Sequence, residues 1–484
     1  MHKANLVRFL LGLCVGAAAS PSEPARAKYV FLFIGDGMGP AQVALAEAYR
    51  ASVDGDPVGF ASTSFSRFPV RAEVTTHCAV RRTTESAAAA TAIASGTKAG
   101  EAALGVDPSG RSLRTLAEEA RDAGVPTGIL TTVPVNHATP AGFYAHVLDR
   151  NMYWEIGRQL TDSRMSVFGG GDFQEPTGKT GEGKEDLRKM ATRKGFHLVR
   201  GRDSIAANIK LPAILLGTRP EVDALPWSVD SAAASTPSLA DYVKAAARLL
   251  DGPKGFFVMA EGGKIDWACH ANDARSEIGE VWAMDDAVKV ALDFANGHPG
   301  QTLILVTADH ETGGLSLGNG ENGYVTNFGW LRHQTMSQEA LASRLAPIAA
   351  YVGAGTAKDT AAAFRAALTE IGKATGLGRE DGLVLSRGDS TELETAFSWS
   401  LPGRKVPPEA KATYGGDRPL AFVATRMLAR KAGVGWTSTA HTSIPVPLYA
   451  FGAGQEKFGG RLDNTDISRI LREMVEWKGR RAAP

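Results

Sequence analysis

Three runs of apolar residues along the chain each lead directly into a carboxylate or a histidine. The runs and the polar residues that follow them are 29–34 with Asp36, 256–260 with Glu261, and 302–307 with Asp309 and His310. Continuous apolar runs of this length are typical of strands that are covered on both faces, as in a parallel sheet. Ligands bind such sheets at the carboxyl ends of the strands, so we expect these polar residues to converge there.

The same pattern predicts metal ions at this edge of the sheet. Two like charges ~4 Å apart repel each other by about 4 kcal/mol at an effective dielectric constant of ~20. A bound cation removes this repulsion. We therefore predict that the three carboxylates and the imidazole bind metal.

Between residues 29 and 320, strand-like runs alternate with runs of helical periodicity, which is typical of repeated β-α-β units. Beyond the three runs above, the sequence predicts strands at 128–132 and 213–216 and helices at 145–160 and 239–250. We therefore predict the α/β class, with a mostly parallel central sheet that is flanked by helices on both faces.

In residues 321–436 the hydrophobic pattern changes, because helical periodicity replaces the pattern of buried strands. The buried-strand pattern returns only at 445–451. Such a block inside an α/β chain is typical of an insertion. We predict an α/β catalytic domain formed by 28–320 and 437–484. The insertion over 321–436 would serve as a lid, a crown or an oligomer contact.

The composition is that of an ordinary globular protein, with 44% hydrophobic and 22% charged residues among 484. The formal net charge of +1 provides no bulk attraction to nucleic acid or to a membrane surface, so we expect neither as a partner. Once an N-terminal signal is removed, Cys78 and Cys269 allow at most one disulfide.

The first 27 residues resemble an export signal. Basic residues precede an apolar stretch at 9–19, and a small-x-small cleavage site ends at Ala27. The stretch is too short for a typical membrane span, and no later segment reaches the length of about 18 apolar residues that a span requires. We therefore expect a periplasmic or secreted protein that starts after a signal peptide over 1–27.

Asp266 and His270 stand four residues apart, which places both on one face of a helix, where they can bind one metal together. Glu261, five residues upstream, strengthens this interpretation. For Asp309 the alternative is a helix cap, and for His441, which has no such neighbours, it is a core or loop histidine. Histidines are scarce, and four of the ten lie in strand-end or loop motifs, which favours metal binding: His137, His270, His310 and His441.

Ser86 opens an Ala-rich segment that the sequence predicts to be helical, and two interpretations remain equal. It either caps the helix or uses the positive end of the helix, with a nearby metal, to act as a nucleophile on phosphate. Arg150 is either an ordinary helix-face charge or a guanidinium that binds two phosphate oxygens at once.

In combination these motifs strongly resemble the alkaline phosphatase family, in the order of that family and over residues 29–320 and 437–455. The motifs are Gly35-Asp36-Gly37, Glu85-Ser86-Ala87-Ala88, His137-Ala138-Thr139-Pro140, Arg150, Glu261, Asp266, His270, Asp309-His310 and His441-Thr442. The resemblance implies metal-dependent hydrolysis of phosphate monoesters by a centre with two zinc ions and one magnesium ion.

The resemblance also implies a role for each residue. The implied ligands are Asp266, His270 and His441 for one zinc, Asp36, Asp309 and His310 for the second, and Asp36, Thr139 and Glu261 for magnesium, with His137 close by. Ser86 would attack phosphorus and form a phosphoserine, which water then hydrolyses, while Arg150 holds two phosphate oxygens. Little contact with the leaving group is needed, so a broad range of monoesters is expected.

Three positions depart from the common family pattern. His137 stands where the best-known bacterial enzymes have Asp, which bears on the identity of the third metal. Trp267 stands where Lys or His is common, so a positive charge near the phosphate is lost. Glu85 replaces the Asp that often precedes the serine, which bears on the orientation of Arg150.

Two alternatives compete with a phosphomonoesterase. One is a phosphodiesterase or sulfatase of the same superfamily, and the other is a non-catalytic zinc- or phosphate-binding protein of the periplasm. The expected partners are small phosphate monoesters, and a second copy of the chain in a homodimer is a further hypothesis.

Overall fold

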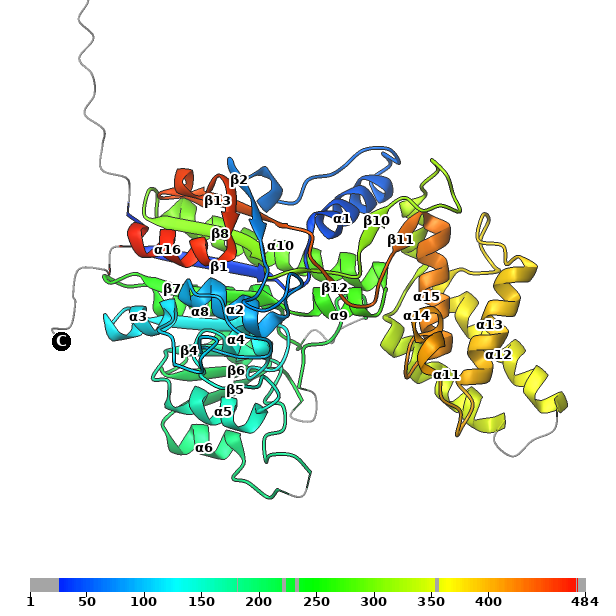
Figure 1. Ribbon diagram of the computed structural model, residues 1–484, viewed down its shortest axis with the longest axis horizontal. Helices are drawn as coiled ribbons and strands as arrows, with labels where there is room; N and C mark the ends of the chain where they lie inside the picture. The colour runs from blue at the N-terminus through cyan, green and yellow to red at the C-terminus, as the bar shows by residue number, and fades with distance from the viewer. Residues whose placement is uncertain are drawn as a thin grey trace, which may run out of the picture.

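The computed structural model describes residues 26–180, 182–219, 223–230, 235–352, 357–475 and 477. At its centre lies a ten-stranded sheet (Figure 1). Its strands are β1 (Tyr29–Gly35), β2 (Val70–Thr75), β3 (Thr127–Thr131), β4 (Val167–Gly170), β5 (His197–Arg200), β6 (Ala213–Leu216), β7 (Phe256–Gly262), β8 (Thr302–Ala308), β13 (Val446–Gly452) and β14 (Gly460–Asp463). The spatial order is β14-β2-β13-β8-β1-β7-β3-β4-β6-β5.

Within this sheet β13 runs antiparallel to its neighbours β2 and β8, and the other pairings are parallel. The three central strands β1, β7 and β8 are buried along their whole length, as their continuous apolar sequences predict. Their register aligns Gly35 with Gly262 on one side and with Ala308 on the other. The residues at these strand ends therefore meet at one edge of the sheet.

Helices cover both faces of the sheet, which confirms the predicted architecture. They are α1 (Pro40–Val53), α2 (Ser86–Ser95), α3 (Leu116–Asp122), α4 (Ala138–Ala141), α5 (Tyr153–Asp162), α6 (Leu187–Arg193), α7 (Arg202–Ala206), α8 (Leu239–Leu250), α9 (Lys264–His270), α10 (Ala274–Gly297) and α16 (Asn464–Met474). Phe256 packs against Phe294 of α10 at a ring distance of 5.2 Å, whereas its neighbour Phe257 packs against Phe143, just beyond α4, at 6.2 Å. Successive strand residues point to opposite faces, so these contacts lie on two sides.

The predicted helix at 145–160 is wrong over its first half, because only α5 is helical there. The backbone of Val147 instead exchanges hydrogen bonds with Leu104, and the Arg150 N–H donates to the carbonyl of Ala102. These bonds use the backbone groups that a helix would need. Arg150 consequently lies in a turn between α4 and α5 rather than on the exposed face of a helix.

Within residues 321–436, five helices form a lobe beside the carboxyl ends of the central strands (Figure 1). They are α11 (Gln338–Tyr351), α12 (Ala357–Thr375), α13 (Arg387–Trp399), α14 (Lys411–Tyr414) and α15 (Pro419–Ala432). Their buried apolar residues form a cluster of their own, whereas Leu428 and Ala429 of α15 belong to the main core. The helical lobe is therefore anchored to the sheet domain, and the division into domains stays a prediction.

Short elements complete the fold around the strand ends. They are the 3-10 helices η1 (Phe65–Arg67), η2 (Phe328–His333), η4 (Pro408–Ala410) and η5 (Gln455–Phe458), and the strands β9 (Glu311–Thr312), β10 (Leu315–Leu317), β11 (Val434–Trp436) and β12 (His441–Thr442). Strand β12 pairs with β9, so His441 lies opposite Thr312 although the two are far apart in the sequence.

The predicted signal peptide lies outside the described residues except for its last two positions. No helix in the described part of the chain has the length and apolar composition needed to cross a membrane. Cys78 and Cys269 are both buried and free, so the one disulfide that the sequence allows does not form here.

A half-buried ion pair between His146 and Glu118 links the turn before α5 to α3. The Glu118 Oε1 lies 3.1 Å from His146 Nε2, and this hydrogen bond raises the pKa of His146 above 6.5. Burial would raise the pKa of Glu118, but the bond to His146 holds it below 4.5. The stabilisation is therefore present between about pH 4.5 and 6.5 and is lost as the pH rises through the folded-state pKa of His146.

We expect His146→Gln to lower the free energy of unfolding by about 1 kcal/mol near pH 6 and by clearly less near pH 9. Urea unfolding at the two pH values measures the difference. The exposed His197 provides the matched control, His197→Gln. An equal loss of stability at both pH values would show that charge on His146 is not involved.

Candidate metal centre

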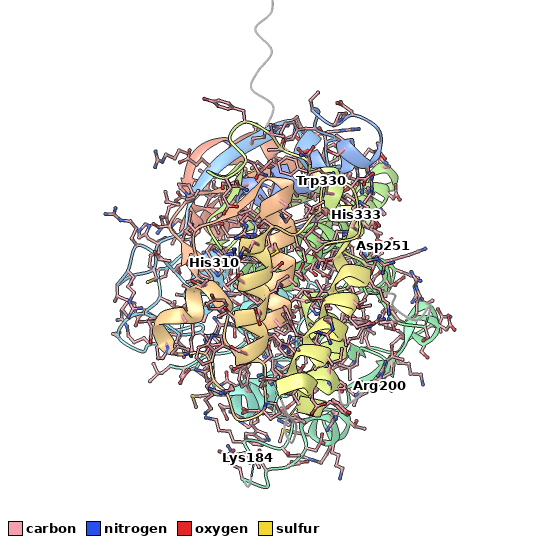
Figure 2. The ribbon with its side chains drawn as sticks, turned by 90° about the vertical axis from the view of Figure 1, so that its right-hand side faces the viewer. Lys184, Arg200, Asp251, His310, Trp330 and His333 are labelled. Carbon is pink, nitrogen blue, oxygen red and sulfur yellow. The ribbon has the colours of Figure 1, made fainter. Side chains whose placement is uncertain are left out.

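The predicted ligands converge at the carboxyl ends of the central strands. Asp36 follows β1, Asp309 follows β8 and Glu261 lies near the end of β7. Helix α9 brings Asp266 and His270 to the same edge, and the β12–β9 pairing brings His441. In Figure 1 the strands point toward the helical lobe. Figure 2 views the molecule from the side of that lobe, and His310 lies behind the helices of the lobe.

One group of candidate ligands contains Asp266, His310 and His441, whose ligand atoms lie within 4.8 Å of one another. His270 adjoins this group, since its Nε2 is 3.1 Å from His441 Nε2 and 3.2 Å from an Asp266 oxygen. The structure thus brings together the three residues that the resemblance implies for one zinc. Two imidazole nitrogens and a carboxylate around one point form a donor set that suits zinc.

The outward nitrogens of these histidines fix their orientation. His270 Nδ1 lies 2.6 Å from the carbonyl oxygen of Thr439, and His441 Nδ1 lies 2.9 Å from that of Thr84. A carbonyl only accepts, so each Nδ1 carries a hydrogen and each Nε2 is the nitrogen that faces the centre. This is the tautomer that a metal-binding histidine requires.

The second group contains Asp36, Asp309 and His310, all fully buried. His310 Nε2 lies 3.2 Å from an Asp309 oxygen and 3.5 Å from an Asp36 oxygen. The Asp36 Oδ1 and Asp309 Oδ2 atoms are buried and accept no hydrogen bond from the described residues. Buried carboxylate oxygens without donors are costly, so the site fits a cation.

Electrostatics support the same conclusion. Burial, followed by repulsion from neighbouring carboxylates, raises the pKa of Asp36 well above its ordinary range and that of Asp309 to about 8. Burial also raises the pKa of Glu261 to about 7. Burial would do the same to Asp266, but the adjacent His270 holds the pKa of that carboxyl below its ordinary value. The protein alone therefore does not balance the negative charge gathered here.

The implied magnesium ligands also lie together. Thr139 Oγ1 donates to an Asp36 oxygen at 3.4 Å, and Thr131 donates to Glu261, whose other oxygen has no partner among the described residues. Oxygen donors of this kind suit magnesium. His137 adds an imidazole, whose Nε2 lies 3.4 Å from Arg150 and whose pKa burial lowers to about 3.

Ser86 is the first residue of α2, and the N-cap is Glu85. The Glu85 carboxylate accepts hydrogen bonds from the backbone N–H groups of Ala87 and Ala88 at 2.9 and 2.8 Å. The capping interpretation of Ser86 is therefore wrong. Its hydroxyl is buried and lies 3.4 Å from His310 Nε2, next to the second ligand group.

Glu85 also contacts Arg150, whose orientation the sequence analysis linked to this position, whereas the capping role of Glu85 was missed. Its Oε2 accepts a hydrogen bond from Arg150 Nη1 at 2.8 Å, so one carboxylate caps α2 and orients the arginine. The signal was present in the sequence as a carboxylate directly before the serine. Trp267 is another of the positions that depart from the common family pattern. Its ring lies edge-on to His137, with 5.9 Å between the ring centroids.

Glu311 is a further residue that the sequence analysis did not single out. It follows His310, is 1% exposed, and accepts hydrogen bonds from Gln42 at 2.8 Å and from Thr442. The backbone N–H groups of Gly314 and Leu315 also donate to it, each at 3.2 Å. The carboxylate thereby ties α1, the turn after β9 and strand β12, which are next to the elements that carry the ligands.

We expect Glu311→Gln to weaken metal binding by about 10- to 100-fold, since an amide nitrogen cannot accept the bonds that hold the His441 strand. Competition with a chromogenic chelator measures the affinity. Glu280→Gln is the matched control, because Glu280 is also buried and accepts two bonds from Ser228, away from the ligands. Equal affinities for the two variants would contradict the role assigned to Glu311.

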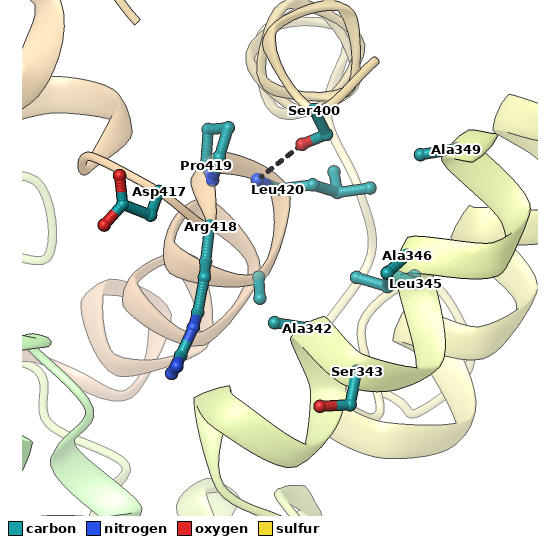
Figure 3. A pocket seen from close by; sticks show the side chains of 11 residues that line it. Ala342, Ser343, Leu345, Ala346, Ala349, Ser400, Asp417, Arg418, Pro419 and Leu420 are labelled. Atoms are coloured by element: carbon teal, nitrogen blue, oxygen red, sulfur yellow. Dashed lines mark hydrogen bonds between the residues drawn. The ribbon is translucent and has the colours of Figure 1, made fainter. Parts of the chain in front are cut away.

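Two depressions open beside His270. The larger, of about 410 Å³, reaches the helical lobe, and the smaller, of about 290 Å³, reaches Glu85 and Arg81. An apolar pocket of about 270 Å³ lies within the lobe between α11 and α15 and contains none of the candidate ligands (Figure 3). The open space next to the metal centre is therefore on the His270 side.

Known proteins are similar to this chain in sequence and in fold. The family model for alkaline phosphatase matches residues 27–477. Alkaline phosphatase 4 of Bacillus subtilis is 31% identical over 468 residues, which cover 95% of this chain and 91% of that protein. The cold-active alkaline phosphatase of a psychrophilic Shewanella sp. is 27% identical with a TM-score of 0.74, over 92% of this chain and 99% of the other. A His-to-Glu mutant of the TAB5 alkaline phosphatase, solved with Mg bound in its M3 site, is 25% identical with a TM-score of 0.63, over 94% and 99%.

Proposed function

The chain belongs to the alkaline phosphatase family and hydrolyses phosphate monoesters with bound metal, and from this premise we propose that Ser86 is its nucleophile. The observation that supports this role is the position of the hydroxyl, 3.4 Å from His310 Nε2 and at the first position of α2. The positive end of the helix dipole favours the negative charge of the attacking oxygen and of phosphate.

We further propose two zinc ions and one magnesium ion as the resident metals. The zinc ligands are Asp266, His270 and His441 at one site and Asp36, Asp309 and His310 at the other, and the magnesium ligands are Asp36, Thr139 and Glu261. When bound, these ions supply Lewis acidity that lowers the pKa of the serine hydroxyl and stabilises the departing oxygen. The imidazole-rich and oxygen-rich donor sets support this division, as does the magnesium in the M3 site of the TAB5 mutant.

The residues of the chain then carry out two displacements. Ser86 Oγ forms a bond to phosphorus as the bond to the leaving alkoxide breaks, which gives a phosphoserine. Water next replaces Ser86 at phosphorus and releases inorganic phosphate. Arg150, oriented by Glu85, binds two phosphate oxygens in both steps. Because no contact with the leaving group is needed for this chemistry, the proposal includes a broad range of monoesters.

A trapping experiment tests the nucleophile. We expect a monoester mixed with the metal-loaded enzyme and quenched in acid to leave phosphate on the peptide that contains Ser86, as read by mass spectrometry. Side-by-side assays of a nitrophenyl phosphate monoester, a diester and a sulfate test the reaction class. Faster turnover of the diester or the sulfate would contradict the monoesterase.

Location and assembly are also proposals. We propose that residues 1–27 direct export, so that the mature enzyme is periplasmic or secreted, and that 321–436 is an insertion in a domain formed by 28–320 and 437–484. We also propose a homodimer. N-terminal sequencing of exported protein and light scattering of the purified enzyme test the first and last of these.

A further inference from the structure

The larger depression beside His270 connects the metal centre to the helical lobe. It has a volume of about 410 Å³, which is within the range of sites for small molecules. One wall belongs to the sheet domain and contains His270 and Thr439. The opposite wall comes from the insertion and includes Gln338, Lys411, Asp417 and Arg418.

The geometry of an in-line displacement determines which part of the substrate occupies this depression. The attacking and leaving oxygens lie on opposite sides of phosphorus. Ser86 lies beside His310, at the second ligand group, and His270 lies at the far side of the first group. The leaving oxygen therefore faces His270. His270 lines both depressions and Ser86 lines neither, and the larger one, whose opposite wall comes from the insertion, has more room for the rest of the alcohol. This step rests on the proposed role of Ser86.

The charged residues on the insertion wall determine which charge on a ligand this depression favours. Lys411 is exposed on α14 and makes no ion pair with any residue that the structure describes. Arg418 lies 3.5 Å from Glu339, so its charge is partly balanced, and Asp417 is the one carboxylate of the lining. Figure 3 shows the Asp417 and Arg418 side chains pointing in different directions from adjacent positions at the start of α15. The unpaired lysine is thus the group available to a ligand.

We propose that the insertion forms the outer wall of a leaving-group site, and that Lys411 makes this site favour phosphate monoesters whose alcohol carries a second anionic group, a carboxylate or a second phosphate. Such a group meets an ammonium that has no ion-pair partner among the described residues. The helical lobe thereby contributes to substrate selection, although none of the candidate metal ligands in the described part of the chain belongs to it.

Two substrates that differ only in the second anion test the proposal. Glycerol 3-phosphate and 3-phosphoglycerate have the same carbon skeleton and phosphate position, but only the latter has a carboxylate. The measured quantity is the ratio of their kcat/KM values with the metal-loaded enzyme. We expect Lys411→Gln to lower the preference for 3-phosphoglycerate by about fivefold at low salt.

Two further variants sharpen the test. Lys405→Gln removes the same charge from an exposed lysine of the same lobe that does not line the depression, and we expect it to leave the ratio unchanged. Asp417→Asn removes the carboxylate of the lining, and we expect it to raise the preference for 3-phosphoglycerate. Opposite shifts for Lys411→Gln and Asp417→Asn would support a charge-selective site.

The outcomes separate this proposal from the proposed function. If Lys411→Gln and Lys405→Gln give the same ratio while both substrates are hydrolysed, the leaving-group site is wrong and the phosphatase stands. If the metal-loaded enzyme hydrolyses neither of these substrates nor a nitrophenyl phosphate, the proposed function itself is wrong.

Discussion

Replacing Ser86 with alanine is expected to lower kcat/KM for a phosphate monoester by about 10³-fold or more. The loss follows because the hydroxyl that forms the covalent intermediate is absent, and water must then attack phosphorus directly. The ligand groups stay intact, since the methyl group of alanine fits wherever the serine fits. Steady-state kinetics and elemental analysis of the same sample measure the two quantities.

Ser95→Ala is the matched control for this experiment. Ser95 is the last residue of the same helix, is also buried, and donates its hydroxyl hydrogen to the Thr91 carbonyl, far from the ligands. We expect this variant to keep wild-type turnover. Unchanged activity in Ser86→Ala would remove the serine from the mechanism, and loss of bound zinc would show that Ser86 acts through the metal site instead.

The sequence predicted the sheet because its central strands are buried on both faces. In β1, β7 and β8 nearly every residue before the polar end is apolar, so the strands are visible without knowledge of their partners. The ligands at their ends were predictable for the same reason, because parallel strands end at a common edge. Asp36 and Asp309 could therefore be placed together from the sequence alone.

Long-range backbone contacts account for what the sequence did not reveal. The helical pattern at 145–160 was misleading because pairing with Leu104 outweighs local helix propensity at Val147. The carbonyl groups that orient His270 and His441 belong to Thr439 and Thr84, and a backbone carbonyl leaves no mark in a sequence. The sequence likewise did not show that Glu85, rather than Ser86, caps α2.

Removal of the metal ions is expected to abolish turnover and to lower the free energy of unfolding by several kcal/mol. A ligand that binds only the folded state at about 1,000 times its Kd stabilises it by about 4 kcal/mol. Here the loss leaves Asp36, Asp309 and Glu261 buried together without a counter-charge. Thermal unfolding before and after dialysis against a chelator measures the loss, and we expect zinc with magnesium to restore both stability and activity.

The variant Asp309→Asn separates metal binding from general damage to the fold. It removes a ligand and, above about pH 8, also one of the charges that repel each other, since burial with that repulsion raises the pKa of Asp309 to about 8. We therefore expect metal-free Asp309→Asn to be at least as stable as metal-free wild type, whereas added zinc should stabilise it much less. A metal-free variant clearly less stable than metal-free wild type would contradict the repulsion, because the carboxylate would then stabilise the fold through contacts with the protein rather than through a bound cation.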